Sequence, residues 1–97
     1  AEQLHYILIE NAFADHYYLR EKDNFKKIIT RFFESYKDSK WKSRVQFVNG
    51  VALINSGDEK KGGEELESIL KNKDAKDYIK ELARSELSLM KIKSKNI

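Results

Sequence analysis

Two histidines carry side chains that commonly serve as metal ligands or proton-transfer groups. His5 and His16 are eleven positions apart in a segment rich in apolar residues. If that segment is one helix, a rise of about 1.5 Å per residue puts them on one face but about 16 Å apart. They are then too distant to bind the same metal ion. The favoured interpretation is structural, with both histidines as polar positions on a packed face.

Carboxylates gather further along the chain, and paired carboxylates are used in acid–base catalysis and in cation binding. Their spacing is not that of a calcium-binding loop, and no histidine lies among them. Lysines are interspersed with them, which is typical of a solvated helix face. We therefore predict no catalytic, cofactor or metal site, and no enzyme. The carboxylates are Asp58, Glu59, Glu64, Glu65 and Glu67, with Lys60, Lys61 and Lys71 nearby.

Gly62 and Gly63 are adjacent glycines of the kind found in phosphate-binding loops. Those loops need further glycines at set intervals and a preceding strand, and neither is present. Close packing of two helices at Gly62 explains this residue better. Gly63 is expected to be more exposed, where a glycine only weakens a helix, by about 1 kcal/mol.

Trp41 stands between Lys40 and Lys42, with Arg44 following. A tryptophan among cations can stack on a base or bind an acidic peptide. It can equally be an anchor at the edge of a core, and single aromatic residues beside lysines are common on helical surfaces. We favour the anchoring interpretation and keep Trp41 as a candidate partner-binding residue.

The composition limits the classes of protein that the chain can be. Ninety-seven residues with 40% hydrophobic content fit one domain over residues 1–97. The absence of cysteine excludes disulfides, thiolate metal sites and a cysteine nucleophile. No apolar run is long enough to cross a bilayer.

The charge leaves a second function open. Nineteen basic and sixteen acidic residues give a formal charge of +3, which makes a weak field unless the fold separates the signs. The alternative to protein binding is therefore a small basic helical module that binds nucleic acid. That function requires one shared face for six basic residues: Lys26, Lys27, Arg31, Lys40, Lys42 and Arg44.

The apolar spacing predicts an all-α fold of about five amphipathic helices. With no proline and four glycines, the helix ends must be set by other signals. Asp23 or Asn24, Asp38 or Ser39, Asp58 and Asp74 are the expected caps, and Gly57 the expected left-handed turn residue. The predicted helices cover residues 2–20, 25–36, 41–56, 59–70 and from 74 onward.

Two of these helices have unusual apolar faces. Helix 2–20 is apolar over more than one stripe and therefore needs partners on two sides. In the last helix Leu89 and Ile92 lie off the apolar stripe. The predicted core face of that helix consists of Ala75, Tyr78, Ile79, Leu82, Ala83, Leu87 and Met90.

The unit from Arg44 to Leu70 resembles a tetratricopeptide repeat, in which small residues let two helices approach closely. Gln46, Asn49 and Asp74 depart from that repeat, which has large apolar residues at the first two positions and proline at the third. The resemblance implies a right-handed stack of antiparallel helical hairpins. Its helix-packing positions are Gly50, Leu53, Gly57, Gly62 and Leu66.

Residues 40–92 further resemble the tetratricopeptide-like periplasmic domain of bacterial ancillary Sec-translocon subunits. The similar stretches are residues 52–58, then Leu66, Ile69 and Leu70, then Tyr78, residues 82–84 and Leu87. This resemblance implies an inner-membrane protein with a periplasmic domain, a role in envelope protein export, and an anchoring helix before Ala1. Without it, a cytoplasmic location is expected.

A short helical stack leaves apolar surface at its ends, so we expect a non-catalytic protein-interaction domain, a scaffold or adaptor, that needs no cofactor. The first expected docking surface is the outer face of helix 2–20, through Tyr6, Phe13 and Tyr17. An upstream helix, a second copy of the chain or a client protein are the expected occupants.

Overall fold

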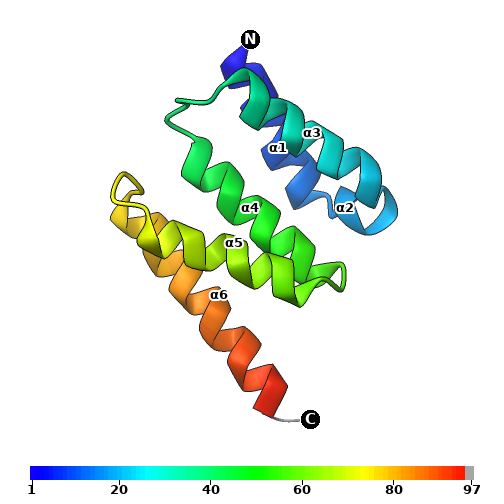
Figure 1. Ribbon diagram of the computed structural model, residues 1–97. Helices are drawn as coiled ribbons and strands as arrows, with labels where there is room; N and C mark the ends of the chain where they lie inside the picture. Colours follow the sequence, from blue (N-terminus) through cyan, green and yellow to red (C-terminus); the bar gives the residue numbers. More distant parts are fainter. Residues whose placement is uncertain (96–97) are drawn as a thin grey trace.

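The computed structural model describes the backbone of residues 1–95 and the side chains of residues 1–92. Within residues 1–95 the chain forms six α-helices and no strand, which confirms the predicted all-α class. Neighbouring long helices run back and forth, with α4 in the middle of the molecule (Figure 1). The helices are α1 (Glu2–Ala14), α2 (Tyr17–Arg20), α3 (Lys22–Ser35), α4 (Lys42–Asn55), α5 (Glu59–Lys71) and α6 (Asp77–Lys95).

The predicted first helix is broken in two. α1 ends at Ala14, and His16 adopts left-handed dihedrals (φ 56°, ψ 33°) before α2 begins. Arg20 pairs with Asp15 across this turn. The change of direction turns Tyr18 into the core, where it is buried. Since His5 and His16 are not on one continuous helix, the prediction that they share a helix face was wrong.

The predicted helix caps have mixed outcomes. The Asp58 carboxylate accepts a hydrogen bond from the Lys61 backbone amide at 3.2 Å, which confirms that cap. Ser39 Oγ accepts one from the Trp41 amide at 3.1 Å, but Trp41 itself is the cap position of α4, so the cap predicted at Asp38 or Ser39 was wrong. Gly57 has a φ of 104°, as its turn position requires. Asp23, in contrast, lies in the first turn of α3 rather than at its cap.

The start of the last helix was also misplaced. Asp74 lies in the turn before α6, where its backbone amide donates to the Asn72 side chain. α6 itself begins at Asp77, so the cap predicted at Asp74 was wrong.

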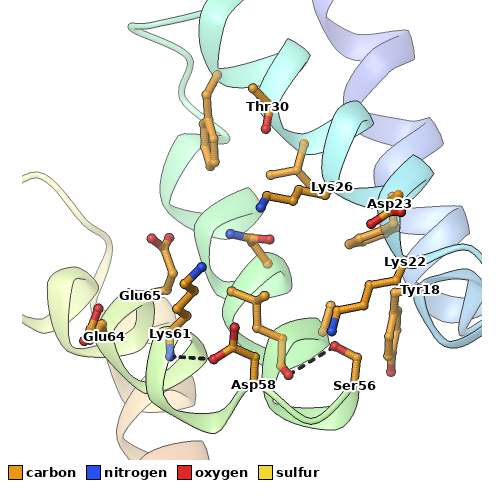
Figure 2. A pocket seen from close by; sticks show the side chains of 16 residues that line it. Tyr18, Lys22, Asp23, Lys26, Thr30, Ser56, Asp58, Lys61, Glu64 and Glu65 are labelled. Carbon is orange, nitrogen blue, oxygen red and sulfur yellow. Dashed lines mark hydrogen bonds between the residues drawn. The ribbon is translucent and has the colours of Figure 1, made fainter.

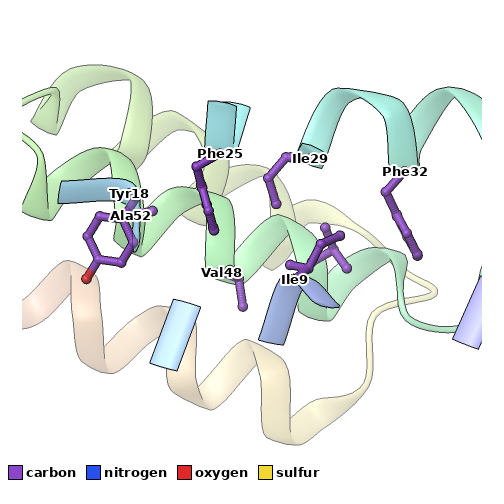
Figure 3. Close-up of a cluster of buried hydrophobic side chains, with 8 residues drawn as sticks. Ile9, Tyr18, Phe25, Ile29, Phe32, Val48 and Ala52 are labelled. Carbon is purple, nitrogen blue, oxygen red and sulfur yellow. The ribbon is translucent and has the colours of Figure 1, made fainter. Parts of the chain in front are cut away.

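Two apolar clusters hold the helices together, and α4 contributes to both. The N-terminal cluster joins α1 to α4 and is seen in Figure 3. The C-terminal cluster joins α4 to α6, and half-buried Phe13 of α1 packs against both. The N-terminal cluster comprises Ile9, Tyr18, Phe25, Ile29, Phe32, Val45, Val48 and Ala52. The C-terminal cluster comprises Phe47, Val51, Leu66, Ile69, Ala75, Ile79, Ala83 and Leu87.

Gly50 and Gly62 lie where α4 and α5 cross. A Cβ added to Gly62 would be 2.6 Å from the Gly50 carbonyl oxygen, and one added to Gly50 would be 2.9 Å from Leu66 Cδ2. The two backbones therefore approach more closely than alanines allow. Fully buried Leu66 fills the space beside Gly50.

Gly63 is buried, contrary to its predicted exposure. A Cβ there would be 3.2 Å from Met90 Cε of α6. The adjacent glycines thus serve two different contacts, because Gly62 faces α4 and Gly63 faces α6. That arrangement gives a physical reason for two consecutive glycines in α5 despite their cost to helix stability.

Candidate functional site

The four predicted partner-binding residues do not form an outer surface. Tyr6, Phe13, Tyr17 and Trp41 are all half-buried against the N-terminal cluster. Tyr6 stacks on Trp41 with ring centroids 4.8 Å apart, and Lys40 covers the same indole. The placement of Tyr6, Phe13 and Tyr17 on the outer face of the first helix was therefore wrong, because all three pack against the N-terminal cluster. Partner binding by these residues stays a prediction. Trp41 has the anchoring position that we favoured.

The exposed apolar residues of α1 are others. Leu4, Ile7 and Leu8 are 68%, 43% and 52% exposed, whereas Ile9 is completely buried. Spacings of three and four residues put these side chains on one face of the helix. We call this surface, formed by Leu4, Ile7 and Leu8, the outer face of α1. The helix is apolar on two sides, but only one of them meets the core.

A second exposed stripe follows α6. Tyr78, Leu82, Leu89 and Ile92 are exposed, at spacings of four, seven and three residues. Tyr78 and Leu82 were predicted as core residues, and that prediction was wrong because α5 covers a narrower strip of α6, centred on Ile79, Ala83 and Leu87.

A groove lies between α3 and α5, with α4 as its floor. It has a volume of about 600 Å³. Figure 2 shows Lys22 and Lys26 reaching into it from α3, and Lys61 and Glu65 from α5. The apolar part of its lining comes from side chains of α3 and α4. They are Phe25, Ile29, Phe33, Ala52 and Leu53.

Leu53 was predicted to pack between α4 and α5, but it lines the groove. It is half-buried, it belongs to neither core cluster, and it lines the groove together with Asn49. These residues are four positions apart and therefore share one face of α4. The groove was not predicted. The sequence feature that could have predicted the groove is Asn49, a polar residue at a position where the tetratricopeptide repeat has a large apolar one.

One ion pair ties α1 to α4. Arg44 donates from Nε and Nη2 to the two oxygens of Glu10, at 2.7 and 3.0 Å, and the Tyr6 hydroxyl also donates to Glu10. The partners are 34 residues apart and half-buried. This contact adds to the packing of Ile9 and Phe13, which puts one side of α1 against the core.

The ion pair shifts the pKa values of its members. Burial, with the hydrogen bond to Glu10 and its negative charge, raises the pKa of Tyr6 to about 12. Burial also acts to raise the pKa of Glu10, but the hydrogen bonds from Arg44 and Tyr6 and the Arg44 charge outweigh it and leave that pKa lowered. The hydrogen bond to Glu10 raises the pKa of Arg44 despite burial.

The two histidines have separate places, whereas three of the predicted carboxylates share the groove. His5 Nδ1 lies 3.0 Å from the Tyr36 hydroxyl, and the His16 ring packs on Tyr18. Glu64 and Glu65 border the groove. Among the side chains of residues 1–92, no three His, Asp or Glu residues converge as metal ligands would.

The six basic residues of the alternative function have unlike surroundings. Lys26, Lys27 and Arg31 share a shallow depression of α3 with Asp23 and Glu34. Arg44 is held by Glu10, and Lys40 lies over Trp41. The acidic neighbours reduce the positive field that a phosphate backbone would meet.

No helix within residues 1–95 combines enough length with enough apolar character to cross a membrane. Comparison of the chain with protein-family models, with curated proteins and with solved structures gave no match.

Proposed function

We propose that the chain is a non-catalytic protein-interaction domain, a helical scaffold or adaptor of the tetratricopeptide-like type. The observation that carries this proposal is the outer face of α1. Three large aliphatic side chains there face solvent on a helix whose opposite side is packed in the core. Contiguous exposed apolar residues mark interaction sites in soluble domains.

The energetics favour a covered state of this face. Complete burial of one leucine side chain contributes roughly 1.5–3 kcal/mol relative to exposure. Leu4 and Leu8 are both more than half exposed, so most of that contribution is still available to a partner. The stripe on α6 provides a second apolar surface of the same kind.

The resemblance to the periplasmic domain of ancillary Sec-translocon subunits gives this proposal a biological setting. On this basis we propose a location in the bacterial envelope, where its partners would be components or clients of protein export. The close crossing of α4 and α5 at Gly50 and Gly62 supports the tetratricopeptide-like part of that setting.

The test is crosslinking and pull-down from the native cell with a surface variant. Leu4→Lys combined with Leu8→Lys is expected to abolish partner capture and leave folding intact, because neither side chain belongs to a core cluster. Leu19→Lys is the matched control, since this leucine of α2 is 57% exposed and lies outside the outer face of α1. Equal partner capture by the unchanged protein, the Leu4 and Leu8 double variant and the Leu19 variant would refute the assignment of this face.

Nucleic-acid binding is separated from protein binding by the effect of salt. Contacts with phosphates weaken steeply between about 50 and 200 mM salt, whereas burial of leucines does not. A gel shift that appears at low salt and disappears over this range, together with unchanged protein capture by the Leu4 and Leu8 variant, would favour the alternative.

A further inference from the structure

The groove between α3 and α5 has the shape of a long channel rather than a closed cavity. Its lining residues on α3 run from Lys22 to Phe33 along one face of that helix. Eleven residues of helix correspond to about 16 Å, or about three turns. On α5 the lining runs from Asp58, the cap, to Glu65. Such a channel matches the length of a short helix better than that of a small compact ligand.

The two walls of the groove differ in charge. On the α3 wall Lys22 and Lys26 accompany one carboxylate, Asp23. On the α5 wall Asp58, Glu64 and Glu65 accompany one lysine, Lys61. The walls thus carry net charges of +1 and −2. Among the side chains of residues 1–92, Lys22, Lys26, Glu64 and Glu65 form no ion pair.

The groove contains apolar surface that the core does not fully use. Its lining shares Phe25, Ile29 and Ala52 with the N-terminal cluster. Leu53 is the central example, because it packs against neither cluster and lines the groove. Phe33 of α3 is a second half-buried lining residue, and it also packs against the N-terminal cluster. An occupant therefore needs an apolar stripe to cover this floor, in addition to charges for the walls.

Granting the protein-binding role above, we propose that this groove binds an amphipathic helix of a partner protein. The apolar stripe of that helix covers Leu53 and Phe33. Its acidic flank faces Lys22 and Lys26 of α3, and its basic flank faces Glu64 and Glu65 of α5. The occupant is thus defined by one apolar stripe between two flanks of opposite charge.

The exposed apolar helix faces within residues 1–92 do not have this pattern, which argues against a second copy as the occupant. α1 contains no lysine or arginine to face the α5 wall. Within residues 77–92 of α6, the exposed stripe has Glu81 on one side and Glu86 on the other, and two acidic borders would be repelled by the α5 wall. The charge arrangement therefore points to a different protein.

The test uses three synthetic helical peptides with one leucine stripe and different flanks. One has an acidic and a basic flank, one has two acidic flanks, and one has two basic flanks. Fluorescence anisotropy with the 97-residue chain measures each Kd. The mixed peptide is expected to bind about fivefold more tightly than either control, because only it avoids repulsion by one wall. Reversing the helix direction exchanges its flanks, so no single polarity needs to be assumed.

Two protein variants complete the test. Lys22→Glu with Lys26→Glu makes both walls acidic, so it is expected to weaken the mixed peptide about fivefold and make the two-basic peptide the tightest. Leu53→Asp is expected to weaken all three peptides at least about tenfold. The charge variant alters only exposed side chains, so it remains informative if Leu53→Asp fails to fold.

Several outcomes overturn the proposal: no binding by any peptide up to about 1 mM, equal binding by all three, or no effect of either variant. NMR chemical shift changes on the outer face of α1 would show that the peptide binds there and not in the groove. Shift changes of the groove amides with protein concentration alone would show that the groove binds a second copy of the chain. If the groove variants have no effect while Leu4→Lys with Leu8→Lys still abolishes partner capture, this proposal fails and the proposed function stands.

Discussion

At the scale of single residues, Glu10 links α1 to α4. Its carboxylate accepts from Arg44 and from Tyr6, whose ring stacks on Trp41. One side chain therefore connects α1, the start of α4 and the aromatic edge of the N-terminal cluster. The geometry also explains why Arg44 does not contribute to a basic surface.

This ion pair predicts a pH-dependent stability. The folded pKa of Glu10 is lowered, so its contribution is fully present above the unfolded value of about 4.3 and is lost as pH falls through the folded pKa. Glu10→Gln is expected to lower the free energy of unfolding by about 1 kcal/mol at pH 7, because the pair is only half-buried. Urea denaturation of both proteins between pH 7 and pH 2 measures the difference, which should vanish at the acidic end.

Glu81→Gln is the matched control for this experiment. Glu81 pairs with Arg84 on an exposed part of α6, where water screens the interaction. An effect of Glu81→Gln as large as that of Glu10→Gln would contradict the role assigned to Glu10.

At the scale of the helices, the crossing of α4 and α5 depends on backbone proximity. Both glycines are buried, and each leaves room for the other's carbonyl group. Their spacing relative to Leu53, Gly57 and Leu66 carries the resemblance to a tetratricopeptide repeat. The structure keeps only Gly50, Gly62 and Leu66 at the helix crossing. Leu53 lines the groove instead, and Gly57 is an exposed turn residue with no atom within 4 Å of an added Cβ, so both helix-packing predictions were wrong.

Gly62→Ala is expected to destabilise the protein by about 1–3 kcal/mol, although alanine is the better helix former. The added Cβ would lie 2.6 Å from both the Gly50 carbonyl oxygen and Ile54 Cγ1, so the helices must move apart. Chemical denaturation followed by circular dichroism measures the change.

Gly57→Ala serves as the comparison, since its cost comes from a positive φ with no atom within 4 Å of the new Cβ. A Gly62→Ala protein more stable than the parent would show that the helices are not in close contact.

At the scale of the whole molecule, α4 makes two small clusters into one cooperative unit. Val45, Val48 and Ala52 belong to the N-terminal cluster, and Phe47 and Val51 belong to the C-terminal cluster. Loss of either cluster removes one side of the packing around α4. Phe13 adds a direct contact between the two.

We therefore expect a single unfolding transition. Val48→Ala and Ile69→Ala, one in each cluster, should each lower the stability by about 2–4 kcal/mol. In both variants the Trp41 fluorescence, which reports on the N-terminal cluster, and the helical circular dichroism should change at the same urea concentration. Separate transitions for the two probes in the Ile69→Ala protein would show that the clusters unfold independently.

The sequence was sufficient for features set by local rules. Apolar residues at helical intervals gave the all-α class, and Asp58 and Gly57 marked the turn between α4 and α5 correctly. Asp74 failed as a cap because the same residue type is equally suited to a turn, where Asn72 accepts its amide hydrogen bond. His16 gave no local signal strong enough to predict the break between α1 and α2.

Which side of each helix meets the core was decided only by the tertiary structure. The residues of α1 and α6 are apolar on more than one side, so their periodicity alone allows several rotations about the helix axis. Burial of Ile9 in one cluster and of Ile79 and Ala83 in the other selects one rotation for each helix. The Glu10–Arg44 pair and the proximity of Gly63 to Met90 add to that packing. In this arrangement Leu4, Leu8, Tyr78 and Leu82 are exposed, and a groove lies between α3 and α5. These features could not be predicted from the sequence, because contacts between distant segments have no signature in local spacing.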